Sequence, residues 1–416
     1  GDTVALKLRL ITREQETFEN AFAAQIEDYR KVRPDVNIEV VTLPIADHFL
    51  KMVHQRGCTS DEFDLFLCNT DWLPEVIARG EIVNLNELID SHPPHGWPDA
   101  WHPAMLGLQK SGGNVYGLPW HDGPVVFHTR SDLFESADEK ARFLAECGRA
   151  LEVPKSWDEF LEVSQFFTRP EEDLWGTVVA AYTDGHNDVY DFLIQLWSRG
   201  GELFDASGNP VFDSAIGVEA LQFCSDLIHK YKVASPECLK LGSVESGDYY
   251  ALGKAAMMVN WCGFAAVCEM PQYSKIVGKN RCTTVPSGPA GSISLNIYWV
   301  LTIPVGSKQA EEAYAFMQHI SAPHTDKMVS MAGANGVRLS TWNDAEVRSV
   351  YPHYGIIESV HAKTRTLPAI PEYPQVNEMI SAAVHRVVHL GQDAGENLKL
   401  AADEARGYLR STGRLK

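Results

Sequence analysis

The sequence has no run of 18 or more apolar residues and no excess of positive charge. Lys and Arg number 36 against 55 Asp and Glu, which gives a formal net charge of −19. A membrane-spanning helix requires an apolar run of that length, so we expect no such helix in this chain. Nucleic-acid binding depends on basic side chains that neutralise phosphates, so we expect no nucleic-acid partner. An acidic balance favours solubility, and we expect a monomer.

The motifs of several enzyme and metal-site classes are also missing. There is no G-x-S-x-G, P-loop or Rossmann glycine pattern in a suitable context. The eight cysteines contain no C-x-x-C pair, so a zinc ribbon or a thioredoxin-type motif is not expected. Most of these cysteines are expected to be buried free thiols. If the protein is exported, one or two disulfides are possible, with Cys58–Cys68 or a pair among Cys262, Cys268 and Cys282 as candidates.

Fifteen histidines raise the question of a metal site. His385 and His389 lie four residues apart on one predicted helix, and His353 and His361 precede them. No H-E-x-x-H pattern occurs there, so we interpret the pair as part of a solvated helix face. We predict no bound metal and no cofactor.

The first 80 residues alternate between strand and helix patterns. "VALKLRLIT", "DVNIEVVTL" and "FDLFLCN" predict three strands. Apolar residues at helical spacing predict a helix over residues 13–32, with Thr12 and Gln15 at the spacing of a capping box. A second helix is predicted near residues 46–56. This strand–helix order predicts a parallel sheet covered by helices.

Helical patterns dominate from about residue 130 until a strand pattern returns at "ISLNIYWVLTIP". "DVYDFLIQLW" and "GVEALQFCSDLIHKY" predict helices, Ser156 and Glu159 form a capping box, and "KAAMMVNW" predicts a buried strand. Later helices are predicted at residues 308–320, 375–389 and 396–410.

The late return of a strand predicts two discontinuous α/β lobes. Residues 1–119 with 290–340 would form an N-terminal lobe, and residues 120–289 with 341–416 a C-terminal lobe. Crossovers are predicted near residues 120–125, 283–292 and 340–350. Such crossovers would form a hinge, with a ligand cleft between the lobes.

Several segments resemble family 1 of the extracellular solute-binding proteins of ABC importers, a sugar-binding group that includes maltose-binding protein. They occur in the family's order and cover nearly the whole chain: "FDLFLCNTDWLPEVIARGEIVNLNELI", "VYGLPWHDGPVVFHTRSDLF", "WDEF", "GGELFD", "LGKAAMMVNW", "IPVGSKQAEEAYAFMQHI" and "TLPAIPEYPQVNE". Departures lie at Phe127 or His128, where the family often has Tyr, and near Val337, where it often has Pro. They leave the specific sugar open.

The resemblance implies a two-lobed periplasmic-binding-protein type II fold with hinge crossovers. It also implies a function without catalysis: the protein would bind a mono- or oligosaccharide, or a derivative, and deliver it to permease subunits in the membrane. A periplasmic or extracellular location follows. The chain begins at Gly1 and enters a strand pattern almost at once, as we expect of a mature exported protein.

Sugar recognition uses aromatic faces, which pack on the C–H faces of the ring, and polar side chains, which bond its hydroxyls. We expect such residues at strand ends and crossovers. Asp71, Asp188 and Tyr190 also match ligand positions of the family. Trp120 and Trp261 are predicted to form apolar platforms on opposite sides of the cleft. The candidate ligand residues are Arg13, Glu14, Asn69, Asp71, Trp72, Trp120, His121, Asp122, Asp188, Tyr190, Trp261, Phe264, Arg338, Tyr373 and Asn377.

Structural alternatives stay open for these residues. Asn69 would serve equally as a turn residue, Asp188 as an ordinary helix N-terminus, and either tryptophan as core packing. Tyr249 and Tyr250 resemble the tyrosine pairs of ferric-binding relatives. The rival function is a secreted glycoside hydrolase or lyase that uses Asp122 with Asp71 or Asp188. Nothing in the sequence fixes the separation of those carboxylates.

Overall fold

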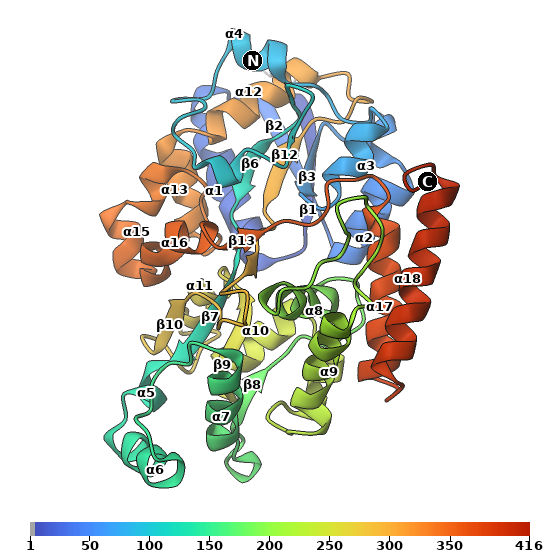
Figure 1. Cartoon of the computed structure of the whole chain (residues 1–416). Helices are drawn as coiled ribbons and strands as arrows, with labels where there is room; N and C mark the ends of the chain where they lie inside the picture. The colour runs from blue at the N-terminus through green and yellow to red at the C-terminus, as the bar shows by residue number, and fades with distance from the viewer. Residues whose placement is uncertain (1–4) are drawn as a thin grey trace. The chain divides into compact units, whose positions relative to one another are not determined.

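The structure is a computed structural model that describes residues 5–416, and these form two compact units (Figure 1). Unit 1 runs to Gly123 and adds Ile297–Ile357 and Leu367–Pro371. Unit 2 consists of Pro124–Asn296, Glu358–Thr366 and Glu372–Lys416. Each unit is therefore assembled from segments far apart in the sequence. Among the described residues, no helix is long and apolar enough to cross a membrane.

Unit 1 is built on a five-stranded sheet in the order β2-β1-β3-β12-β6. β1 pairs in parallel with β2 and with β3, as the strand–helix order predicts. β12 is antiparallel to both of its neighbours, β3 and β6. The strands of unit 1, with a small hairpin, are β1 (Leu6–Arg13), β2 (Val36–Leu43), β3 (Leu65–Asn69), β4 (Lys110–Ser111), β5 (Asn114–Val115), β6 (Leu118–His121) and β12 (Trp299–Thr302).

Helices cover both faces of this sheet, with α1, α12 and α13 packed together on one side and α2 and α3 on the other (Figure 1). The helices of unit 1 are α1 (Glu16–Val32), α2 (Ile45–Phe49), η1 (Leu50–His54), η2 (Gly57–Thr59), α3 (Leu73–Ala78), α4 (Asn86–Ser91), η3 (Pro103–Met105), α12 (Ala310–Ile320), α13 (Pro323–Met331), α14 (Leu339–Trp342), α15 (Ala345–Val350) and η6 (Pro352–Ile356). The predicted capping box before α1 is wrong. Thr12 lies inside β1, and Gln15 is the N-cap without a side-chain capping bond.

Unit 2 contains a four-stranded sheet in the order β10-β7-β9-β8, with a separate pair formed by β11 and β13. β7 is antiparallel to β9 and β10, and β8 is parallel to β9. The predicted buried strand "KAAMMVNW" is confirmed as β9. The strands of unit 2 are β7 (Val125–Arg130), β8 (Trp175–Val178), β9 (Ala255–Trp261), β10 (Asn280–Thr283), β11 (Ser294–Leu295) and β13 (Thr364–Arg365).

The helices of unit 2 include a layer in which α8, α9, α17 and α18 pack against one another (Figure 1). Ser156 caps α7 by accepting a hydrogen bond from the N–H of Glu159, as its sequence motif predicts. The helices are α5 (Ser131–Phe134), α6 (Ala137–Cys147), α7 (Trp157–Phe167), η4 (Pro170–Glu172), α8 (Asn187–Ser198), α9 (Ala215–His229), η5 (Pro236–Lys240), α10 (Ser243–Ala251), α11 (Phe264–Cys268), α17 (Tyr373–Val388) and α18 (Ala394–Ser411). α16 (Ile357–His361) spans the point where the chain leaves unit 1.

The unit boundaries differ from the predicted lobe boundaries in four places, and one of them is Leu367–Pro371, which belongs to unit 1. Residues 120–123 belong to unit 1 because β6 pairs with β12. Residues 290–296 belong to unit 2, where β11 pairs with β13. Residues 341–357 belong to unit 1, where the Thr341 hydroxyl donates a 2.6 Å hydrogen bond to the Asp326 carboxylate.

The segment "ISLNIYWVLTIP" is therefore not one long strand. It supplies β11 to unit 2 and β12 to unit 1, and the chain crosses between units after Asn296. The prediction that a strand from this segment joins the first three strands is confirmed by the pairing of β12 with β3.

All eight cysteines are free thiols in the structure, so the disulfides left open above, Cys58 with Cys68 or a pair among Cys262, Cys268 and Cys282, are not formed. Burial raises the pKa of the Cys58 and Cys238 thiols, which keeps them protonated and unreactive at neutral pH.

Candidate functional site

The first group of candidate residues lies where strands of unit 1 end. Arg13 ends β1, Asp71 and Trp72 follow β3, and Trp299 begins the antiparallel β12, directly opposite Asn69. The Trp72 and Trp299 rings meet edge to face, with centroids 5.4 Å apart. The Arg13 guanidinium lies 6.0 Å from the centre of the Trp299 ring. We call Arg13, Asp71, Trp72 and Trp299 the strand-end cluster.

Trp299 was missed by the sequence analysis, although it belongs to this cluster. Its signal is the strand register, because an antiparallel β12 must begin at the edge where the parallel strands end. Asn69 takes the turn role left open above, since its Oδ1 accepts a hydrogen bond from the Asp71 N–H at 3.2 Å. Glu14 is exposed next to this cluster.

The stretch Trp120-His121-Asp122 lies inside unit 1. The Trp120 ring stacks on Phe22 of α1, with centroids 4.0 Å apart and planes 5° apart, and its side chain is 2% exposed. Its Nε1–H donates to Gln25 Oε1 at 2.8 Å. These contacts with α1 make Trp120 a core residue, which corrects its prediction as a ligand platform.

His121 and Asp122 connect β6 to the loop that contains Asn335. His121 Nδ1 accepts from the Asn335 N–H at 3.0 Å, and the Asp122 N–H donates to the Asn335 carbonyl at 2.9 Å. Asp122 Oδ1 also accepts from the Gly123 N–H. Burial, and next the positive charge of Arg13, lower the pKa of His121 to about 3, so the imidazole is neutral at physiological pH. These contacts assign both residues a structural role in place of the predicted ligand contact.

Arg338 and Phe264 are likewise packed within their own units. Arg338 Nη1 donates to two main-chain carbonyls, those of His95 and Ser321, and its guanidinium lies 4.4 Å from the centre of the Trp101 ring. Phe264 is 5% exposed and lies against Gly247 so closely that any Cβ there would clash with its ring. Both predictions as ligand residues are corrected for this reason.

The second group of candidates converges at the start of α8 in unit 2. His186, Tyr190 and Trp261 form a mutual aromatic contact, with ring centroids 5.0 to 5.8 Å apart. Trp261 is half-buried, and its Nε1–H donates to Asn187 Oδ1 at 2.9 Å. The indole edge is thereby fixed while part of the ring stays accessible. His186 and Asn187 were not among the predicted residues.

Helix α17 completes this group. Tyr373 donates its hydroxyl to Asn377 Oδ1 at 3.1 Å, and Asn377 Nδ2 donates to the Gly185 carbonyl at 2.8 Å. Ser381 donates to Asp188 Oδ2 at 2.6 Å. We call the combined set the α8 cluster; it consists of His186, Asn187, Asp188, Tyr190, Trp261, Tyr373, Asn377 and Ser381. It brings together five of the predicted residues: Asp188, Tyr190, Trp261, Tyr373 and Asn377.

A buried series of hydrogen bonds leads to the main-chain carbonyl of Trp261. The Tyr250 hydroxyl donates to Asn280 Oδ1 at 2.8 Å, and Asn280 Nδ2 lies 3.3 Å from His128 Nδ1. His128 Nε2 lies 3.1 Å from the Trp261 carbonyl oxygen. Burial lowers the pKa of His128 to about 4, so a neutral ring accepts at Nδ1 and donates at Nε2. The Tyr250 hydroxyl is therefore engaged in this series of hydrogen bonds, whereas the tyrosines of the ferric-binding pairs act as ligands.

Asp188 combines a helix N-terminal position with deep burial. Burial, and next the neighbouring Asp184 carboxylate, raise the pKa of Asp188, against the lowering effect of the Ser381 hydrogen bond. Asp188 also borders a cavity of about 60 Å³ behind α8, whose lining is mostly apolar. That volume holds a few water molecules, whereas small-molecule sites occupy roughly 300–1,000 Å³. The internal cavity is too small to be a sugar site.

A larger hollow of about 480 Å³ lies elsewhere in unit 2, beside β10. Its lining includes Lys155, Arg281 and Lys363, together with several hydroxyl side chains. None of the predicted ligand residues lines it.

The His385–His389 pair is more structured than the predicted solvated face. The two rings stack with centroids 4.5 Å apart, and both are half-buried. His385 Nδ1 lies 2.7 Å from the Thr183 hydroxyl, and His389 Nε2 lies 2.7 Å from the Ala181 carbonyl oxygen. The pair holds the segment that leads into α8.

Residues 12–324 match the family model described as bacterial extracellular solute-binding protein. The chain belongs to this family. A probable ABC transporter-binding protein of Deinococcus radiodurans is 24% identical over 371 residues, which cover 85% of this solute-binding protein and 83% of that relative. A probable amino-acid ABC transporter periplasmic-binding protein of Sinorhizobium fredii is 22% identical, and the match covers 99% of this chain and 91% of that relative.

Among solved structures, maltose-bound T. maritima MalE3 superposes with a TM-score of 0.87 at 23% identity. The match covers 97% of this solute-binding protein and 100% of MalE3. The chain therefore has the MalE-like two-lobed α/β fold of periplasmic binding proteins.

Proposed function

We propose that this solute-binding protein binds a carbohydrate and delivers it to the permease subunits of an ABC importer, without catalysing a reaction. The observation that carries the proposal is Trp261, a half-buried indole whose edge is fixed by Asn187 and whose strand is supported by His128. A ring held in place before the ligand arrives loses little conformational entropy on binding. Such a ring suits the apolar face of a sugar.

Polar groups within each unit would supply the hydroxyl contacts. In unit 2 we assign this role to His186, Tyr373 and Asn377, with Asp188 and Tyr190 as supports. In unit 1 we assign it to Arg13, Asp71 and Glu14, since Trp72 and Trp299 are only 6% and 5% exposed. Neutral hydrogen bonds contribute about 0.5–1.5 kcal/mol each and bonds to charged groups about 1.5–3 kcal/mol. A few of these bonds with one stacked ring suffice for micromolar affinity, near −8 kcal/mol.

The absence of catalysis is supported by the state of Asp122, which both carboxylate pairs of the rival enzyme would need, and by that of Asp188. Asp122 Oδ1 accepts the Gly123 N–H, and the Asp122 main chain is bonded on both sides to Asn335. Asp188 Oδ2 is engaged by Ser381. A general acid or base needs an oxygen that can reach the substrate, and the chain's family consists of binding proteins.

The test starts with a thermal-shift screen of carbohydrates, polyols and amino acids, because one relative is named for amino acids. A ligand at 100 times its Kd should stabilise the protein by about 2.7 kcal/mol. Calorimetry then compares the wild type with Trp261→Ala. We expect at least about a tenfold loss of carbohydrate affinity, which corresponds to about 1.4 kcal/mol.

Trp175→Ala is the matched control. Trp175 is also a half-buried tryptophan in the same sheet, but it pairs with Ala255 at the opposite end of β9. We expect its affinity to equal that of the wild type. Arg281→Ala tests the larger hollow in the same way. An affinity lost in Arg281→Ala and kept in Trp261→Ala would contradict the assigned site, and a response to amino acids alone, or cleavage of the sugar, would contradict the function.

A further inference from the structure

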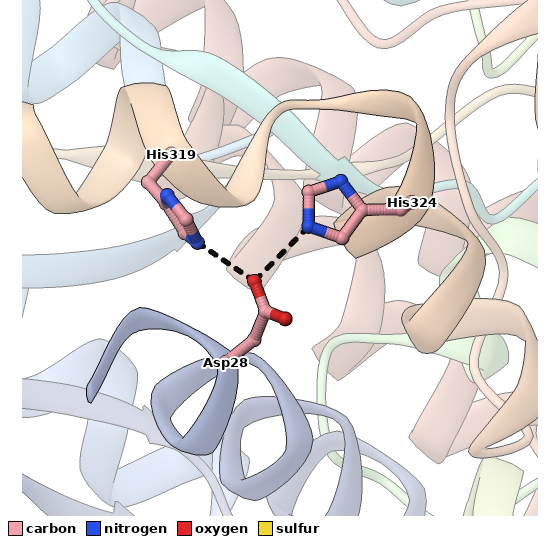
Figure 2. Close-up of side chains that lie close together, drawn as sticks. All are labelled: Asp28, His319 and His324. Atoms are coloured by element: carbon pink, nitrogen blue, oxygen red, sulfur yellow. Dashed lines mark hydrogen bonds and ion pairs between the residues drawn. The ribbon is translucent and has the colours of Figure 1, made fainter. Parts of the chain in front are cut away.

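Two histidines from two helices of unit 1 converge on one carboxylate oxygen of a third helix. Asp28 lies near the end of α1, His319 near the end of α12 and His324 in the first turn of α13. Asp28 Oδ2 lies 2.8 Å from His319 Nε2 and 3.0 Å from His324 Nε2. Figure 2 shows both imidazoles directed at the same oxygen of the Asp28 carboxylate. All three ligand atoms lie within 4.8 Å of one another.

The surroundings hold this trio in place and leave one side open to solvent. The His319 ring contacts Tyr29 with centroids 5.0 Å apart. Gln25 Nε2 donates to the Thr325 carbonyl at 3.0 Å, which ties α1 to the start of α13. The Asp28 and His319 side chains are 13% and 19% exposed, whereas His324 is 60% exposed. Burial would raise the pKa of Asp28, but the hydrogen bonds from His319 and His324 outweigh it and the pKa is lowered.

The chemistry of this set suits a divalent transition metal. Zinc takes imidazole nitrogen and carboxylate oxygen at about 2.0–2.2 Å, so adjacent ligand atoms in a tetrahedron lie roughly 3.4 Å apart. The observed separations from Asp28 Oδ2 are a few tenths of an ångström shorter. Rotation of the exposed His324 side chain would lengthen its own separation, and a small rotation of the Asp28 carboxylate would lengthen both. The four residues between His319 and His324 also fall within the H-x3–5-H spacing of zinc sites.

We propose that Asp28, His319 and His324 bind a zinc ion at the surface of unit 1, with a water molecule at the fourth position. The two imidazoles would turn from hydrogen-bond donors to Asp28 into metal ligands through the same Nε2 atoms. The ion would join α1, α12 and α13, so its binding free energy would add to the stability of unit 1. This proposal departs from the expectation of no metal, which followed from a search of the histidines near the C-terminus.

The test uses untagged, full-length protein freed of metal by a chelator. We expect one Zn²⁺ per chain by calorimetry and by elemental analysis after dialysis, with a rise of a few degrees in the melting temperature. Cu²⁺ and Ni²⁺ should also bind, and Mg²⁺ should not, because the site is rich in imidazole. Co²⁺ should give the visible absorption of a low-symmetry, four-coordinate site.

Two variants and two controls locate the ion. His324→Ala removes the most exposed ligand and should fold normally, and Asp28→Asn removes the central carboxylate. Each should weaken zinc binding by more than about 100-fold, since loss of an outer-shell partner alone costs 10–100-fold. His92→Ala removes an exposed histidine elsewhere in unit 1 and should have no effect. The double variant His385→Ala/His389→Ala should also retain full binding.

Unchanged zinc affinity in both His324→Ala and Asp28→Asn would overturn the proposal. So would the loss of binding in the His385/His389 variant, or the absence of stoichiometric binding in the wild type. In those cases the two histidines serve only as hydrogen-bond donors to Asp28.

Discussion

Replacing Trp120 with alanine should cost stability and leave ligand affinity unchanged. The ring is 2% exposed, stacks on Phe22 at 4.0 Å and meets Phe18 edge to face at 5.1 Å. Truncation of a buried Phe or Trp to Ala costs about 3–5 kcal/mol. It also removes the donor to Gln25 Oε1, and an unsatisfied buried acceptor costs about 1–3 kcal/mol where water cannot replace the bond. We therefore expect a loss near the upper end of 3–5 kcal/mol.

The assay is urea denaturation at 25 °C, followed by circular dichroism, with ligand affinity measured by calorimetry on the same preparation. Net stabilities of about 5–15 kcal/mol make a loss of this size easy to resolve. For a unit of this size it corresponds to a fall in melting temperature of roughly 10 °C.

Trp120→Phe separates the two contributions. It keeps an aromatic ring against Phe22 but removes the Nε1–H, so its cost should lie near 1–2 kcal/mol. Trp261→Ala should show the opposite behaviour to Trp120→Ala, with weaker binding and a smaller stability loss. A Trp120→Ala protein that loses less than about 1 kcal/mol of stability and more than tenfold in affinity would refute the assignment of Trp120 to the core.

Two further substitutions test the structural roles assigned above. His121 has a pKa lowered to about 3, so the unfolded chain binds more protons than the folded chain below pH 6.5, and stability is lost as the pH falls. His121→Asn should flatten this loss by up to about 1.4 kcal/mol per pH unit between pH 6 and 4, and equal slopes in urea titrations would contradict it. Arg338→Leu should lower the unfolding free energy, because it leaves the His95 and Ser321 carbonyls without the Nη1 donor, at a cost of about 1–3 kcal/mol for each buried acceptor. Ligand affinity measured by calorimetry should stay unchanged, and a weaker Kd would return Arg338 to the binding site.

The regular helices and strands were predictable because the spacing of their apolar residues along the sequence determines which face each element buries. β1, β2, β3 and β9, and the long helices α8, α9, α17 and α18, lie where strand or helix periodicity places them. Errors arose where pairing with a distant strand decides the ends of an element. The pairing of β1 with β2 extends to Arg13 opposite Leu43, which carries Thr12 into the sheet and away from the predicted helix cap.

The candidate site was predictable only in part, and for a similar reason. Residues next to strand ends or helix starts, such as Asp188 and Trp261, meet in one cluster because their elements converge there. Trp120 has the same sequence signal as Trp261, an aromatic residue beside a strand end. Its role is decided by Phe22 and Gln25, which lie about one hundred residues earlier and carry no mark of that contact. The Asp28 trio is more remote, because His319 and His324 lie 291 and 296 positions after Asp28 in the sequence.

The late position of β12 governs how the chain acquires its structure during synthesis. β3 and β6 have no direct pairing with each other and are joined only through β12, which ends at Thr302. Until that residue leaves the ribosome, both strands keep an open edge, and unit 2 still lacks α17 and α18. Sequence-distant pairing slows folding because the loop must close before the contacts form. The nascent chain therefore lacks a complete core for most of its synthesis. The unfolded polypeptide can still pass through a narrow channel during this time, but its open strand edges are exposed to aggregation.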